Sequence, residues 1–266
     1  MNHLLRDLAP VSDRAWRAVE QEAKARLSPA LAARKLIDFC GPHGWEYSST
    51  GLGRVTALAS GPAAGVSAAL RRSLPVVELR APFSVAYAEL QDIDRGAQDT
   101  DFGALDTAAR QLAVAENAAV FGGLAGAAAG ICQSTPHPPV PLGSAADGYP
   151  EAVAKAVTQL LDSGVGGPYG LALGEAAYLV ALEATEGGGY RLFEHLRKII
   201  DGPVIWTPGL QGGAVISQRG GDFVFDCGQD VSIGYQNHDA NKVEMYLEET
   251  FTFRINTPEA AVTLAA

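Results

Sequence analysis

The feature that most limits how this chain can fold is a stretch with little side-chain material for building a core. Residues 48–74, SSTGLGRVTALASGPAAGVSAALRRSL, are rich in glycine, serine and alanine and contain few large apolar side chains. A segment of this length without a core of its own is unusual inside a compact domain. We therefore expect it to form an extended arm or a long hairpin.

The rest of the chain has the composition of a folded protein. Of its 266 residues 47% are hydrophobic and 19% charged, which excludes disorder for most of the chain. The net charge of −10 is uneven, with 13 basic and 14 acidic residues up to Gln133 but 7 basic and 16 acidic residues from Ser134 onward. Nucleic-acid binding requires an excess of Lys and Arg, so we expect no nucleic-acid partner.

The cysteines and the apolar runs indicate a cytoplasmic location. Cys40, Cys132 and Cys227 are odd in number and far apart, which predicts reduced thiols rather than a disulfide framework or a metal clip. Charged residues and Pro10 interrupt the N-terminus before a signal peptide can form. The apolar run at residues 118–132 is too short to span a membrane.

The N-terminal region predicts two helices separated by a turn. Ser12 or Asp13 is a suitable cap for the first helix, in which apolar residues recur at helical spacing. The dipeptide Ser28-Pro29 has the order typical of a helix start and predicts a second helix over residues 30–38.

A long alanine-rich helix is predicted over residues 104–129, followed by alternating elements. Gly122, Gly126 and Gly130 recur every four residues, which favours close packing of another element against one helix face. After a proline-rich connector at residues 134–144, we expect helices and short strands in turn, and then strands with alternating apolar residues as far as residue 255. The sequence thus predicts an α+β fold with two regions that meet near residue 133.

Known catalytic signatures are absent from the chain. It contains no GxSxG elbow, no phosphate-binding GxxxxGK[ST] loop and no HExxH pair. The histidines lie outside metal-ligand spacing, and paired carboxylates such as Asp92 and Asp94 fit solvated charge better than acid–base catalysis. We therefore predict no catalytic residues, no metal site and no enzyme.

Three segments carry distinctive motifs, namely RKLIDFCGPHGWEY (34–47), DGPVIWTPGLQGGAVISQRGGDFVFDCGQDVSIGY (201–235) and EETFTFRINTPEAAV (248–262). They closely resemble the encapsulins, the shell proteins of bacterial and archaeal nanocompartments, also known as linocin-like or bacteriocin-like proteins. The resemblance implies the major-capsid fold of tailed bacteriophages, with a peripheral domain, an axial domain and an extended E-loop. The expected divisions are an N-terminal helical region at 1–47, the E-loop at 48–75, a peripheral domain with its backbone helix at 76–133, an axial domain at 134–221 and peripheral strands at 222–266.

The resemblance also implies a groove for the targeting peptide of an enclosed enzyme. Apolar positions in such a groove bury leucine or isoleucine of the peptide, and charged positions fix its register. The alternative is that Arg34 and Asp230 form an internal salt bridge and Ile37 belongs to the core. The matching positions here are Arg34, Ile37, Asp38, Asp230, Ile233 and Tyr235.

Two further expectations follow from the same family. The axial-domain tip would meet its copies around a fivefold pore, lined here by Glu183, Glu186, Gly187, Gly188, Gly189 and Tyr190. Some encapsulins bind flavin beside an aromatic residue before the backbone helix, but the matching stretch SVAYAELQDIDRG has Tyr87 and no tryptophan. We therefore expect no cofactor.

The resemblance predicts a shell protein that self-assembles and packages cargo. About sixty copies in T=1 symmetry are expected, with arms that pack on neighbouring subunits. The cargo would be an enzyme with a C-terminal targeting peptide, for which a ferritin-like protein and a dye-decolourising peroxidase are candidates. The alternatives are a prophage-type major capsid protein that encloses DNA and, less in keeping with the sequence, an enzyme or bacteriocin.

Overall fold

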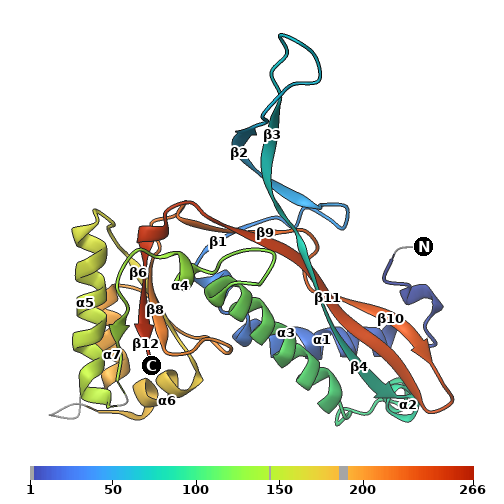
Figure 1. The fold of residues 1–266 in the computed structure, drawn as a ribbon. Helices are drawn as coiled ribbons and strands as arrows, with labels where there is room; N and C mark the ends of the chain where they lie inside the picture. Colours follow the sequence, from blue (N-terminus) through green and yellow to red (C-terminus); the bar gives the residue numbers. More distant parts are fainter. Residues whose placement is uncertain (1–2, 144, 186–190) are drawn as a thin grey trace.

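The computed structural model describes residues 3–143, 145–185 and 191–266. Within these residues the chain forms two five-stranded sheets and a separate two-stranded hairpin (Figure 1). None of the described helices combines the length and the apolar character that a membrane crossing requires.

The first sheet is organised around its longest strand, β11 (Lys242–Ile255). β4 (Val77–Ala86) pairs with β11 in antiparallel register along most of its length. On the opposite side of β11, β10 (Ser232–His238) pairs with its first part and β9 (Phe223–Cys227) with its last part. β1 (Asp38–Cys40) then adds to β9 in parallel, so the N-terminal third of the chain is tied to the C-terminal strands.

Three helices pack against this sheet and close its core. α1 (Asp13–Ala30), α2 (Tyr87–Arg95) and α3 (Gly103–Gly122) share one apolar cluster with β4, β10 and β11, and Leu105 and Met245 are fully buried in it. The Ser12 side chain caps α1 by accepting a hydrogen bond from the Ala15 N–H. The predicted first helix and its cap are therefore confirmed.

The predicted second helix over residues 30–38 is wrong. α1 continues through Pro29, and residues 33–35 form only a 3-10 turn before β1 begins. A proline in the last turn removes a single backbone hydrogen bond. Asn117 of α3 ends the helix instead, because its side chain donates to the Ala30 carbonyl and accepts from the N–H groups of Ala32 and Ala33.

The long helix ends at Gly122, earlier than predicted. Gly123 has a φ of +86°, which a continuing helix does not allow, and a loop leads to the short α4 (Ile131–Ser134). A Cβ on Gly130 would lie 2.2 Å from the Gly123 nitrogen. The repeated glycines therefore permit a tight loop against the end of α3, and they do not line one face of a helix as expected.

Residues in the glycine-rich stretch form a projecting hairpin, as the composition predicted. β2 (Ser49–Ala57) and β3 (Ala69–Pro75) pair with each other and extend away from both sheets (Figure 1). Their side chains are almost all exposed, including Val55 and Leu70, which are each 63% exposed.

The second sheet has the strand order β5–β12–β8–β6–β7. α5 (Tyr149–Asp162) and α7 (Leu192–Ile200) lie side by side against it, and α6 (Glu175–Glu183) packs at one end (Figure 1). The strands are β5 (Val140–Pro141), β6 (Tyr169–Leu173), β7 (Val204–Trp206), β8 (Gly213–Ser217) and β12 (Ala261–Ala265).

The position of β12 differs from the expected division of the chain. The expected division gave residues 222–266 to peripheral strands, and β12, within this range, pairs with β8 and β5 of the second sheet. The 3-10 turn at Pro258–Ala260 redirects the chain after β11, and Ala260, Val262 and Leu264 are fully buried in the core of the second sheet. The C-terminal strand thus holds the two regions together.

Candidate functional site

A groove of about 420 Å³ runs between α1, the N-terminal segment and the start of β10. We call it the α1 groove. It combines an apolar floor with charged residues at its edges. Its lining residues are Leu4, Arg6, Glu20, Ala23, Lys24, Leu27, Ser28, Leu31, Arg34, Asp230, Val231, Ser232, Ile233 and Leu247.

The floor and the rim of the groove come from different elements. Leu27 of α1, Ile233 of β10 and Leu247 of β11 are buried and supply apolar surface. The N-terminal segment closes one side, where the Tyr235 N–H donates to the Leu4 carbonyl over 2.8 Å. Lys24 is exposed on the rim. The arrangement suits a short peptide with alternating apolar and charged contacts.

Arg34 lies at the end of the groove in a network of three carboxylates. Its Nε donates to Glu116 over 2.7 Å, and its two terminal nitrogens bind Asp230 over 2.5 Å and Glu249 over 2.6 Å. Glu116 and Glu249 are fully buried, whereas the side chain of Asp230 is 52% exposed. Arg34 is therefore mainly an internal anchor, and Asp230 is the member of the network that faces solvent.

The imbalance of charge in this network shifts two pKa values. Burial and the neighbouring carboxylate of Glu116 raise the pKa of Glu249 well above its usual 4.5, and Arg34 only partly opposes this. Burial alone would lower the pKa of Arg34, but the attraction of Glu116 and Glu249 outweighs burial and raises it. Arg34 thus stays charged, while Glu249 tends to hold a proton.

The structure brings together three of the six predicted groove residues, namely Arg34, Asp230 and Ile233. Ile37 packs against the core of the second sheet, and Asp38 lines a separate small hollow, where it accepts a hydrogen bond from the Gly221 N–H. Tyr235 is buried in the core of the first sheet and does not line the groove, and its hydroxyl lies 2.6 Å from His238 Nδ1. The chain direction explains the split, because β1 carries residues 38–40 away along β9.

Of the predicted pore residues, only Glu183 lies within the described structure. It is exposed at the end of α6, and nearby Thr185 forms an isolated antiparallel bridge with Arg191. Glu186, Gly187, Gly188, Gly189 and Tyr190 lie outside the described residues.

Sequence reasoning missed the helical wall of the groove. Glu20, Ala23, Lys24, Leu27 and Leu31 recur three or four positions apart, so they share one face of α1 and its continuation. This spacing was present in the sequence and identifies the wall once the groove is assigned to α1.

Comparison with known proteins decides the family. The Linocin M18 family, described as "Encapsulating protein for peroxidase", matches residues 1–252. A type 1 encapsulin shell protein of Rhodospirillum rubrum is 47% identical over 99% of this chain and 96% of its own length. A second, from Rhodococcus erythropolis, is 42% identical over the full length of both chains. The chain belongs to the encapsulin family.

Solved structures show the same fold for this encapsulin. A virus-like particle from Pyrococcus furiosus has a TM-score of 0.63 at 19% identity and covers 92% of this chain and 98% of its own. The capsid of an empty GTA particle has a TM-score of 0.53 at 15% identity, over 89% and 90% of the two chains. The fold is thus the α+β capsid fold of tailed phages. Because its relatives are named as shell proteins, this encapsulin is a structural shell protein rather than an enzyme.

Proposed function

We propose that the protein assembles into a closed icosahedral shell of about sixty copies in the cytoplasm and packages an enzyme inside it. The projecting hairpin supports assembly, since it exposes Val55, Leu58 and Leu70 with no core of its own. Exposed apolar side chains on a long unpaired hairpin favour packing against another chain.

The α1 groove is the proposed docking site of the cargo peptide. The observation that carries this proposal is an open groove with an apolar floor, Leu27, Ile233 and Leu247, next to the half-exposed carboxylate of Asp230. Apolar side chains of an extended peptide would bury against the floor, and a basic or amide group would bind Asp230.

A peroxidase is the favoured class of cargo, because the matching family is described as encapsulating one. A ferritin-like enzyme is the second candidate. A DNA-filled capsid is disfavoured by the net charge of −10, which repels phosphate, and by the names of the relatives. The residues 183–190 remain the proposed pore.

Co-expression with the proposed cargo tests this function. The shell protein is produced with an enzyme from the adjacent gene, once intact and once without its C-terminal segment, and the particles are isolated by size. We expect cargo to co-purify only when the segment is present. Equal amounts of cargo with and without it would contradict peptide docking, and nuclease-protected DNA in the particles would favour the capsid alternative.

A further inference from the structure

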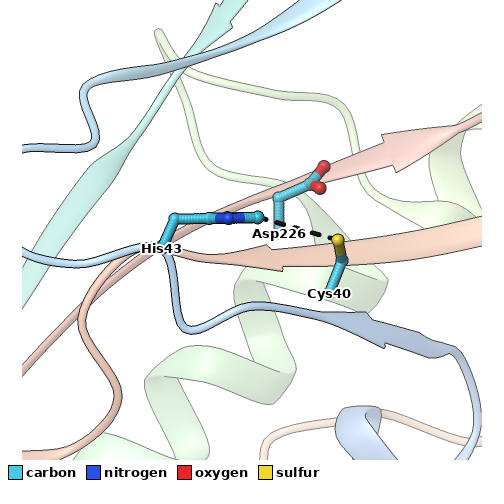
Figure 2. Close-up of side chains that lie close together, drawn as sticks. All are labelled: Cys40, His43 and Asp226. Atoms are coloured by element: carbon cyan, nitrogen blue, oxygen red, sulfur yellow. Dashed lines mark hydrogen bonds between the residues drawn. The ribbon is translucent and has the colours of Figure 1, made fainter.

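Three side chains with metal-binding atoms converge outside the α1 groove. Cys40 is the last residue of β1, and in the parallel pair of β1 and β9 it lies directly opposite Asp226. His43 follows in the next turn. One sulfur, one ring nitrogen and one carboxylate oxygen of the three residues lie within 4.8 Å of one another (Figure 2).

The backbone fixes His43 in this position. Its N–H donates to the Cys227 carbonyl over 2.9 Å, and the next N–H, of Gly44, donates to the Gly228 carbonyl over 2.7 Å. Gly41 has a φ of +118°, and a Cβ there would lie 2.4 Å from the Cys227 oxygen, so only glycine allows this close turn. The ring of His43 also contacts that of Tyr47, with centroids 4.5 Å apart.

The spacing of the donor atoms suits a tetrahedral metal ion. Cys40 Sγ lies 3.6 Å from His43 Nε2. Zinc bonds of about 2.3 Å to sulfur and about 2.05 Å to nitrogen, at a tetrahedral angle, place the two ligand atoms about 3.6 Å apart. The thiol and the imidazole are therefore already separated as two ligands of one zinc ion would be.

Arg254 orients the carboxylate of Asp226, the third potential metal ligand. The Nε and a terminal nitrogen of Arg254 bind the two carboxylate oxygens over 2.7 and 3.0 Å, and the side chain of Asp226 is only 3% exposed. Each carboxylate oxygen has a second lone pair that remains available. A hydrogen-bonding partner behind a carboxylate ligand is the usual arrangement in metal sites, where it orients the ligand.

We propose that Cys40 Sγ, His43 Nε2 and a carboxylate oxygen of Asp226 bind one Zn²⁺ ion per chain. His43 is exposed and Cys40 half-buried, so the fourth position is open to water. The ion would fasten the turn at residues 41–44 to β9, a few residues before the hairpin begins at Ser49. This proposal departs from the expectation of no metal site, which rested on the spacing of the histidines from one another. The Cys-x2-His spacing of residues 40 and 43 pairs a histidine with a cysteine instead.

A zinc titration of the assembled, metal-stripped protein tests the site. In competition with a chromophoric chelator we expect one Zn²⁺ per chain with a Kd on the order of micromolar or tighter. Cys40→Ala and His43→Ala should each weaken binding at least about tenfold, whereas Cys132→Ala, at a remote half-buried cysteine, should leave it unchanged. Circular dichroism of each metal-free variant verifies its fold. Unaltered binding in both ligand variants would overturn the proposal.

Alkylation by iodoacetamide gives a second measurement that needs no substitution. Zinc should slow modification of Cys40 several-fold, because the metal takes up its thiolate. Cys227 is the internal control, since its side chain is fully buried and out of reach of the reagent with or without zinc. With Co²⁺ in place of zinc, a thiolate-to-metal charge-transfer band should appear and be lost in Cys40→Ala. Unchanged alkylation of Cys40 at saturating zinc would contradict the site.

Discussion

At the scale of single residues, Arg34 contacts two kinds of carboxyl group, those that matter for the stability of the fold and one that lies at the proposed docking groove. It binds the buried carboxyl groups of Glu116 and Glu249, and it also reaches Asp230, which is half exposed at the groove. These two buried carboxyl groups have no access to water, so they depend on Arg34 for a charged partner. Asp230 keeps solvent contact and has a backbone partner of its own, the Val231 N–H at 2.8 Å. One cation thus joins the core to the proposed docking surface.

Substitutions at Arg34 and Asp230 should therefore have different effects. Arg34→Met leaves buried carboxylates without a partner and should lower the free energy of unfolding by about 3–5 kcal/mol, measured by urea denaturation, with a loss of shells. Asp230→Lys should keep the yield of shells but reduce the cargo in each at least several-fold.

Asp99→Lys is the matched control for Asp230→Lys, because it makes the same charge change at an exposed residue outside the groove. It should leave both shell yield and cargo content unchanged. A loss of shells in Asp230→Lys would place this residue in the core network and contradict its assignment to docking.

The raised pKa of Glu249 predicts a pH dependence of stability. The folded chain holds this proton more tightly than the unfolded chain, so the stabilising contribution is complete below about pH 4.5 and declines as the pH rises toward the folded-state pKa. Glu249→Gln replaces the titrating carboxyl group by an amide that stays uncharged at every pH. The free energy of unfolding of the wild type, relative to this variant, should therefore fall with increasing pH between 4.5 and 8. A difference that rises over this range would contradict the shift.

At the scale of elements, the sequence pattern predicted those helices and strands whose positions depend on residues close to them in the chain. The alternation of helices and short strands expected after the proline-rich connector follows from turn residues and periodicity, and it is found in α5, β6 and α6. Helix ends that depend on residues distant in the chain were not predicted. Asn117 ends α1 from a position far along the chain, and the loop after Gly123 closes onto Gly130.

The residues of the α1 groove also divide into those that the sequence indicated and those that only the folded structure brings together. The resemblance located Arg34, Asp230 and Ile233, and the spacing on α1 was sufficient to add Leu27 and Leu31. Glu116 and Glu249 become partners of Arg34 only when α3 and β11 pack together, and no local pattern marks such a pairing. The sheet that β12 joins depends in the same way on strands remote in sequence.

The loop after α3 gives a prediction at this scale. Gly130→Ala places a methyl group against the Gly123 backbone, where no flexible side chain is able to move aside. Thermal unfolding should show a loss of about 1–3 kcal/mol. Gly122→Ala is the comparison, because a Cβ there has no neighbour within 4 Å and its cost should be negligible. Equal effects of the two substitutions would contradict the close packing of this loop.

The projecting hairpin gives a second prediction at the scale of elements. Replacing residues 52–72 by Asn-Gly retains the Gly51–Ser73 pair and closes it with a two-residue turn. Since the hairpin contributes little to either core, we expect the subunit to fold with unchanged circular dichroism. Closed shells should be absent by electron microscopy. Normal particles from this variant would show that the hairpin has no part in assembly.

At the scale of the whole molecule, the apolar surface left uncovered is the main argument for association. The hairpin exposes Val55 and Leu70, and α6 exposes Leu179 and Leu182 beside a hollow of about 950 Å³ with Trp206 in its wall. These surfaces lie at opposite parts of the molecule (Figure 1). Separate apolar surfaces of this kind favour contact with more than one neighbour, which the proposed closed shell requires.

The mass of the purified particle tests this account most directly. Sixty chains of 27.7 kDa give a shell of about 1.7 MDa, which mass photometry resolves at nanomolar concentration. We predict one dominant population at this mass, stable on dilution. A protein that remains a monomer of 27.7 kDa at micromolar concentration would contradict the assignment of this chain as a self-assembling shell.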